Sequence, residues 1–230
     1  MSNLDRSTRN AIAGCYQKAG HRLHARWKLA NDPVYAATAG ELGESVLPLL
    51  DIGCGLGLLG HYLNARHHLP RYVGLDRDAR KILAAIAAAD RAGLLPRMQL
   101  DTTDVPALPS LQGHVALLDV LHYLTAEQQQ TLLAAAIAHL APTGRLIIRN
   151  VLREPNWRFH ATRVEEFFLR YSGWIPGGAQ YYPTAEELRT PLEQAGLRVR
   201  IRSLRGHTPY NSYLIVAQRS EHDAQAQTAN

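Results

Sequence analysis

The sequence predicts an α/β fold with a doubly wound, mostly parallel sheet, and three observations support this. Short apolar runs alternate with longer helical patterns over residues 47–151. The first of these runs ends in a glycine cluster, as a buried strand that turns into a helix does. The last two apolar runs, 197–204 and 213–217, have only a short polar turn between them, which favours an antiparallel hairpin. We therefore expect seven strands, an antiparallel last strand and N-terminal helices.

The first forty residues have a helical pattern. Asp32 followed by Pro33 predicts a break in this helical region, and a further helical turn is expected over 36–42. The residues that recur at helical spacing on one predicted face are Ile12, Cys15, Tyr16, Ala19 and Leu23.

The remaining elements follow from capping residues and apolar runs. Asp78 predicts the start of an alanine-rich helix over 80–92, and Gly93 its end. Thr125 and Gln128 form a predicted capping box for a helix that reaches residue 140. Further helices are expected over 58–66, 164–171 and 185–195. The predicted strands are 47–52, 72–75, 98–100, 115–118, 145–151, 197–204 and 213–217.

Length and composition limit the classes of protein to consider. The 230 residues suit one domain, and 46% hydrophobic residues can form a large core. No apolar run approaches the roughly 20 residues that a membrane-spanning helix needs, and residues 1–10 lack a signal-peptide apolar region. Two cysteines, Cys15 and Cys54, are too few for a disulfide framework or a four-thiolate metal site. We expect a soluble, cytoplasmic protein with a disordered tail over 220–230.

The charge is the unusual feature of the composition. The net charge is +5, carried by 22 Arg and only 3 Lys. A basic protein invites a nucleic-acid interpretation, but the arginines are scattered and the chain is equally rich in Ala and Leu, which indicates codon bias. Arg198, Arg200, Arg202 and Arg205 gather on one predicted edge strand, where they would discourage aggregation or meet an acidic carrier protein. Nucleic acid is therefore not the expected partner.

A glycine-rich loop follows the first predicted strand. Residues 51–57 read Asp-Ile-Gly-Cys-Gly-Leu-Gly, and residues 55–60 also spell the G-x-G-x-x-G of dinucleotide-binding loops. However, Asp51 lies two places before the first loop glycine, where its carboxylate would repel a pyrophosphate. A cationic ligand without phosphate, such as S-adenosylmethionine, tolerates that acid well.

These residues resemble the class I S-adenosylmethionine-dependent methyltransferases, whose fold is Rossmann-like. The resemblance covers residues 45–219 and includes the closing hairpin. It implies that Asp76 holds the ribose hydroxyls, that the 104–105 loop meets the adenine, and that 119–123 borders the methyl-transfer site. Asp76 and Asp104 could instead cap a helix or a turn, and Cys54 could simply fill space. The positions assigned to the cofactor are Asp51, Gly53, Cys54, Gly55, Gly57, Asp76, Arg77, Asp104, Val105 and Asp119.

The segment 26–35 is similar to one that precedes the core in some members of this family. There Arg26 or Lys28 would bind the methionine carboxylate of the cofactor, unless both lie on a solvated basic face. We therefore divide the chain into a helical cap (1–44), a methyltransferase domain (45–219) with a lid insert at about 153–183, and the tail.

The motifs also bear on the acceptor of the methyl group. Residues 119–123 read Asp-Val-Leu-His-Tyr rather than the Asn/Asp-Pro-Pro-aromatic of enzymes that methylate base amines. Arg149 precedes Asn150 where catechol-type enzymes place Asp-Asn to help hold magnesium, and a guanidinium would repel the metal. Without a Cys/His cluster for zinc either, we expect no metal.

A hydroxyl or phenol acceptor benefits from a general base, and His122 is the best-placed histidine. It could equally pack at the start of a helix, and Tyr123 would line the pocket. Aromatic residues gather in the predicted lid, which suggests an aromatic acceptor. The residues expected to contact this substrate are Arg149, Trp157, His160, Tyr182, Tyr210 and Asn211.

We therefore expect in-line methylation of a small aromatic or phenolic metabolite. Segments 26–35 and 208–214 together resemble methyltransferases that accompany aryl-polyene pigment biosynthesis, and this resemblance implies an acceptor on an acyl carrier protein. The alternatives are an RNA methyltransferase and a non-catalytic cofactor-binding module of the same fold.

Overall fold

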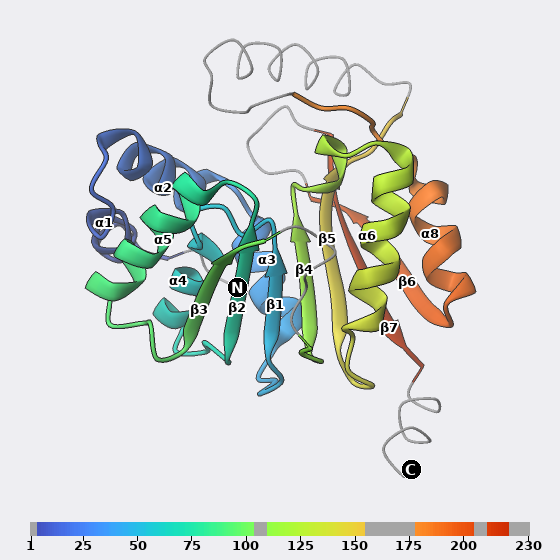
Figure 1. The fold of residues 1–230 in the computed structure, drawn as a ribbon, viewed down its shortest axis with the longest axis horizontal. Helices are drawn as coiled ribbons and strands as arrows, with labels where there is room; N and C mark the ends of the chain where they lie inside the picture. The colour runs from blue at the N-terminus through green and yellow to red at the C-terminus, as the bar shows by residue number, and fades with distance from the viewer. Residues whose placement is uncertain (1–3, 104–109, 155–177, 205–210, 221–230) are drawn as a thin grey trace.

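The computed structural model describes residues 4–103, 110–154, 178–204 and 211–220, which form a seven-stranded sheet with helices on both faces (Figure 1). The order of the strands across the sheet is β3-β2-β1-β4-β5-β7-β6. The pairs among β1 to β5 are parallel, whereas β7 is antiparallel to both β5 and β6. The predicted fold class is confirmed. The strands are β1 Leu49–Ile52, β2 Tyr72–Asp76, β3 Met98–Thr102, β4 His114–Leu118, β5 Arg145–Val151, β6 Leu197–Ser203 and β7 Ser212–Arg219.

The helices begin where the capping residues predict. The Asp78 carboxylate accepts a hydrogen bond from the Arg80 amide at the start of α5, and the capping box of Thr125 and Gln128 is present at the start of α6. Thr184 and Glu187 form a second capping box. The helices are α1 Arg6–Gly14, α2 Ala19–Asn31, α3 Val34–Leu42, α4 Leu58–Ala65, α5 Ala79–Arg91, α6 Ala126–Ala138 and α8 Ala185–Gln194, with a short 3-10 helix, η2, at Leu121–Tyr123.

The predicted single apolar face of the N-terminal region is wrong. The helix α1 ends at Gly14, and α2 begins only at Ala19 after Lys18, whose backbone is extended. This break changes the direction of the chain, so positions on either side of it do not share a face. Tyr16 is buried, whereas Leu23 is 69% exposed.

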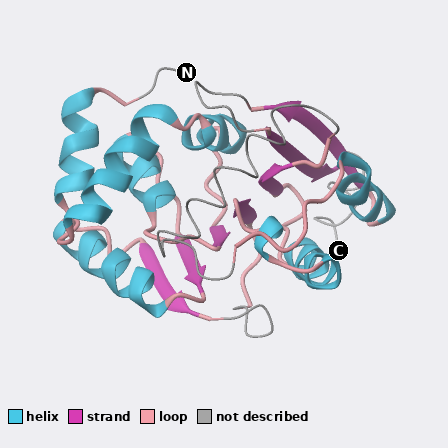
Figure 2. Cartoon of the chain, turned by 90° about the horizontal axis from the view of Figure 1, so that it is seen from above, coloured by secondary structure: helices cyan, strands magenta, loops and turns pink. Residues whose placement is uncertain are grey.

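The sheet separates two apolar layers, and alternate residues of each strand enter one layer or the other. The first layer holds α1 to α5, and the second holds α6 and α8. Seen from above, the strands run between helices on either side (Figure 2). In β5, for example, Ile147 enters the first layer and Ile148 the second. The residues that follow in this strand, Arg149 and Asn150, therefore point to opposite faces of the sheet.

The edge strand β6 shows the predicted alternation of apolar residues and arginines. Val199 and Ile201 pack in the layer of α8, whereas Arg200 and Arg202 lie on the other face. There both arginines pair with Glu41 of α3, at 2.9 and 3.7 Å. Arg205, the last of the predicted cluster, lies outside the described residues. Within the described residues, no helix combines the length and apolar character that a membrane crossing requires.

Candidate functional site

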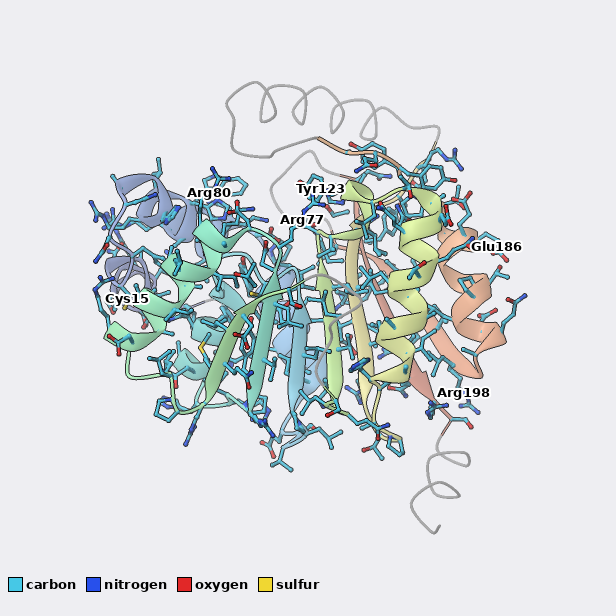
Figure 3. The ribbon with its side chains drawn as sticks, viewed as in Figure 1. Cys15, Arg77, Arg80, Tyr123, Glu186 and Arg198 are labelled. Carbon is cyan, nitrogen blue, oxygen red and sulfur yellow. The ribbon has the colours of Figure 1, made fainter. Side chains whose placement is uncertain are left out.

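The polar side chains of the site gather where the parallel strands end. Arg77 follows β2 and Tyr123 follows β4, and both lie at the upper edge of the sheet in Figure 3, whereas Arg198 lies at the opposite edge. In a parallel sheet this carboxyl edge, at the point where the strand order reverses, is where ligands bind. Here the order reverses between β1 and β4.

The loop after β1 depends on glycine at two positions. Gly53 has a φ of 81°, and a Cβ atom there would lie 2.3 Å from Cγ2 of Val120. The loop after β1 and the loop after β4 therefore touch, and a larger residue would separate them. Gly57 has a φ of 70° at the start of α4, a left-handed conformation that glycine adopts without strain. The amides of Gly53 and Cys54 both donate to the Leu75 carbonyl, which ties the loop to β2.

The carboxylate of Asp76 joins this loop to the next one. Its Oδ2 accepts a hydrogen bond from the Gly55 amide at 2.8 Å, and its Oδ1 accepts one from the Asp78 amide at 2.8 Å. Each carboxylate oxygen has a second lone pair for a further donor. Asp76 is thereby fixed in orientation and still able to accept hydrogen bonds from hydroxyl groups.

Asp51 is a buried carboxylate with incomplete hydrogen bonding. Its Oδ2 accepts a hydrogen bond from the Tyr72 hydroxyl at 2.5 Å, whereas its Oδ1 has no partner among the described residues. Burial raises the pKa of Asp51 to about 7; the Tyr72 hydroxyl opposes this shift and the nearby Asp76 adds to it. A buried oxygen of this kind favours a cationic or hydrogen-bond-donating partner.

Four charged residues form an ion network between the N-terminal helices and the sheet, in which Asp32 and Arg149 are buried and the other two are partly exposed. We call Lys28, Asp32, Asp119 and Arg149 the charge cluster. The Lys28 ammonium lies 2.8 Å from Asp32 Oδ2 and 3.3 Å from Asp119 Oδ2. The Arg149 guanidinium contacts Asp119 and lies 3.7 Å from Asp32 Oδ2. Two cations thus face two anions.

The electrostatics of the charge cluster keep Asp32, Asp119 and Arg149 ionised. Burial alone would raise the pKa of Asp119 and Asp32, but Arg149 and Lys28 outweigh it and hold both below their ordinary values. Burial would lower the pKa of Arg149, but the two carboxylates outweigh burial and hold this pKa above its ordinary value. Asp119 also has a positive φ of 62°, which a short polar side chain tolerates better than most.

His122 lies in η2, directly after β4, and is 3% exposed. Its Nδ1 lies 2.9 Å from Oδ1 of Asn150, which is fully buried on β5. The imidazole lies 4.1 Å from the ring of Tyr123, centre to centre, and is nearly parallel to the ring of Tyr182 at 6.1 Å. Burial lowers the pKa of His122, although Asp119 and Asn150 oppose the shift. The ring is therefore neutral at neutral pH.

The backbone around His122 is held from the opposite side. The Gln129 side-chain amide donates to the carbonyls of Leu121, Leu124 and Tyr181. The amides of Gln180 and Tyr181 donate to the His122 carbonyl at 2.8 and 3.4 Å. These hydrogen bonds join α6 and the segment before α8 to η2, and they therefore fix the position of His122.

Comparisons with known proteins place this chain near methyltransferases. Residues 50–146 match the sequence model of a methyltransferase domain family. A ubiquinone biosynthesis O-methyltransferase of Rhodopseudomonas palustris (strain BisA53) is 27% identical over 158 residues, which cover 66% of this chain. The chain spans 59% of the length of that relative.

Solved structures share the fold. The magnesium protoporphyrin IX methyltransferase of Synechocystis PCC 6803 with bound SAH superposes with a TM-score of 0.65 at 19% identity, covering 93% of this chain and 94% of that one. Residues 50–146 thus match a methyltransferase domain, and the chain shares the fold of a solved methyltransferase. An O-methyltransferase from neocarzinostatin biosynthesis, in complex with SAH and 1,4-dihydroxy-2-naphthoic acid, gives a TM-score of 0.62 at 21% identity, covering 86% of this chain and 56% of that one.

The sheet brings together most of the predicted site residues that the structure describes. Gly53 to Gly57, Asp76, Asp119, His122 and Tyr123 all lie at the carboxyl edge. The two predicted cations differ: Arg26 is exposed on α2, whereas Lys28 belongs to the charge cluster. Arg149 is predicted to contact the substrate, and in the structure it forms ion pairs with Asp119 and Asp32.

The predicted substrate residues are only partly described. The ring of Tyr182 lies parallel to His122, and Asn211 donates to the Leu152 carbonyl and to Glu154. Five predicted residues lie outside the described residues, as does most of the predicted lid insert: Asp104, Val105, Trp157, His160 and Tyr210. Among the residues that are described, no three His, Cys, Asp or Glu side chains lie together as a metal site would require.

Three residues important to the site escaped the sequence analysis. The sequence predicts Asp32 only as part of a helix break. An acid four residues after Lys28 on a helix is nevertheless a signal for an ion pair. Tyr72 lies in an apolar strand, and nothing in its sequence neighbourhood predicts the bond to Asp51. Asn150 was considered only as part of an absent metal motif, and its pairing with His122 arises from the neighbouring positions of β4 and β5 in the sheet.

Proposed function

We propose that this chain binds S-adenosylmethionine and transfers its methyl group to a hydroxyl of a small aromatic molecule. The observation that carries the proposal is the carboxylate of Asp76, held by backbone amides of two loops beside the glycine turn after β1. An acid at the end of β2 is suited to the two hydroxyls of a ribose.

The residues present fit this cofactor better than a dinucleotide. Asp51 would repel a pyrophosphate, whereas S-adenosylmethionine is cationic and has no phosphate. The unpartnered Oδ1 of Asp51 suits the positive methionine end of the cofactor. When bound, the cofactor supplies an electrophilic methyl group on a positively charged sulfur.

The chain itself contributes position and shielding rather than covalent chemistry. Tyr123 and Tyr182 flank His122 with aromatic surface, on which a planar acceptor can pack. Holding the acceptor oxygen in line with the methyl group and excluding water account for much of the acceleration in such a displacement. The ubiquinone and neocarzinostatin relatives are named as O-methyltransferases, which supports a hydroxyl acceptor here.

The cofactor assignment is tested by titration calorimetry with S-adenosylmethionine. We expect Asp76→Asn to weaken binding by about tenfold or more, because a hydrogen bond to a charged group contributes about 1.5–3 kcal/mol. Asp101→Asn is the matched control, since Asp101 lies on the adjacent strand β3 with an exposed carboxylate. Equal affinity of the wild type and Asp76→Asn would refute the ribose assignment.

The acceptor class is tested with a panel of phenols and hydroxynaphthoic acids, free and attached to an acyl carrier protein. We expect a gain of one methyl group on a hydroxyl, detected by mass spectrometry. Preferred turnover of the carrier-bound acceptors would support the carrier and pigment-biosynthesis prediction. Methylation of RNA together with salt-sensitive RNA binding would favour the alternative enzyme.

A further inference from the structure

The pairing of His122 with Asn150 determines which ring nitrogen of the histidine carries its proton. The Asn150 side chain is oriented by a second bond, because its Nδ2 donates to the Val151 carbonyl at 2.9 Å. A carbonyl oxygen only accepts, so the amide nitrogen must face it and Oδ1 must face His122. Since Oδ1 also only accepts, His122 Nδ1 is the donor of the 2.9 Å bond.

A neutral imidazole has one proton, and here that proton is on Nδ1. Burial lowers the pKa of His122, and Arg149 and Lys28 lower it further, whereas the Asp119 carboxylate and the Asn150 bond favour the charged form. The rings of Tyr123 and Tyr182 also pack against the imidazole. Nε2 therefore has the lone pair, which is the form that a general base requires.

The site holds this form in a fixed orientation. The rings of Tyr123 and Tyr182 flank the imidazole, and Gln129 and Gln180 hold the backbone that carries it. Because Asn150 is fully buried and lies on a central strand, the acceptor for Nδ1–H is as rigid as the sheet.

We infer that Asn150 is a positioning residue that keeps His122 in the Nδ1–H form, so that Nε2 takes the proton of the acceptor hydroxyl. This rests on the proposed function. As the hydroxyl oxygen forms its bond to the methyl carbon, the methyl–sulfur bond breaks and its electron pair stays on sulfur. The hydroxyl proton passes to Nε2, and the resulting imidazolium releases a proton to water after the products leave.

His114, at the start of β4, provides an internal reference. It is also buried, but its Nδ1 accepts a hydrogen bond from the Arg145 amide at 3.0 Å. Its proton therefore lies on Nε2, where the partner is the Ser45 hydroxyl at 2.8 Å. The two histidines at opposite ends of β4 should have opposite tautomers.

The experiment combines nitrogen NMR of the histidine rings with steady-state kinetics. In the wild type we expect the proton of His122 on Nδ1 and that of His114 on Nε2, with signals assigned from His122→Asn and His114→Asn. Asn150→Leu should give a mixture of tautomers at His122 and leave His114 unchanged. Circular dichroism and S-adenosylmethionine binding show whether each variant is folded.

The kinetic readout separates positioning from structural support. We expect His122→Asn to lower kcat by about 10²-fold or more, and Asn150→Leu by about tenfold, with the KM for S-adenosylmethionine changed less than about twofold. Asn150→Asp should restore much of the rate, but its carboxylate raises the pKa of His122 and moves the acidic fall of kcat to higher pH. His114→Asn should leave kcat unchanged.

The outcomes that would overturn the inference are distinct from those that would overturn the proposed function. A His122 proton on Nε2 in an active wild type, or an Asn150→Leu variant with unchanged tautomer and kcat, overturns only the role of Asn150. A folded wild type that binds S-adenosylmethionine but methylates no hydroxyl overturns the proposed acceptor and the proton transfer together.

Discussion

At the scale of single residues, the sequence identified the charged and aromatic groups of the site but not their partners. Asp51 and Asp76 could be assigned to the site from the sequence, because each lies at or near the end of a short apolar run, and such runs predict where the strands of a parallel sheet end. The bonds that set their chemistry come from other strands: Tyr72 to Asp51, and Asn150 to His122. Spacing along the chain contains no information on such pairs, since they depend on the register between strands.

The burial of Asp51 predicts a pH dependence of cofactor affinity. Its pKa in the free protein is about 7, so the carboxyl is mostly protonated at pH 6 and mostly ionised at pH 8. A cationic ligand favours the ionised form. The affinity for S-adenosylmethionine should therefore rise as the pH increases through 7, by up to about tenfold per unit on the acidic side, and level off above it.

Titration calorimetry at pH 6, 7 and 8, in buffers of different ionisation enthalpy, measures both the affinity and the proton release. Asp51→Asn is the control, because it keeps the shape of the side chain and leaves only the titration of the ligand. A wild type whose pH dependence matches that of Asp51→Asn would show that the cofactor does not sense this carboxyl.

At the scale of elements, the charge cluster explains how α2 is attached to the sheet. Lys28 and Asp32 come from the end of α2, Asp119 follows β4, and Arg149 lies in β5. The sequence indicated the motif around Arg26 and Lys28, but it predicted cofactor contacts. The structure shows that Lys28 pairs with Asp32 and Asp119, and this pairing becomes visible only in the fold.

Removing Arg149 should be costly, because it leaves the buried Asp32 and the partly exposed Asp119 with Lys28 alone to balance them. We expect Arg149→Met to lower the free energy of unfolding by about 3–5 kcal/mol, measured by urea denaturation. The double variant Arg149→Met/Asp119→Leu should recover part of this loss, because it removes one uncompensated charge.

The matched control is Arg189→Met, which breaks the half-exposed pair of Arg189 and Glu193 on α8. A surface pair of this type contributes about 0–1 kcal/mol. If Arg149→Met were as mild as Arg189→Met, the charge cluster would not be what joins α2 to the sheet.

At the scale of the whole molecule, the order and type of the elements were predictable, because alternating strands and helices permit few topologies. The N-terminal region was predictable only as helical. Its apolar face could not be assigned, because the helical spacing of apolar residues continues across the break at residues 15–18, although Gly14 ends α1 there. The structure places these helices in the same apolar layer as α4 and α5, so they are part of the core (Figure 1).

This arrangement predicts that residues 45–230 do not fold without residues 1–44. Ile12, Tyr16, Leu29, Val34 and Leu42 are all buried in the first layer, and the Tyr16 hydroxyl donates to the Leu56 carbonyl at the glycine loop. Burying an apolar side chain contributes about 1.5–3 kcal/mol, so these five together are comparable to the whole stability of a typical domain, about 5–15 kcal/mol.

We expect the 45–230 fragment to lack a cooperative thermal transition by circular dichroism and to bind a hydrophobic dye. A chain that ends at residue 219 serves as the control for truncation, because the sequence predicts the segment beyond it to be disordered; its transition should match that of the full chain. A fragment 45–230 that unfolds cooperatively and binds S-adenosylmethionine would mean that α1 to α3 are a separable cap. The loop after β1 would then keep its shape without the hydrogen bond from Tyr16, and the cofactor site would belong to the sheet alone.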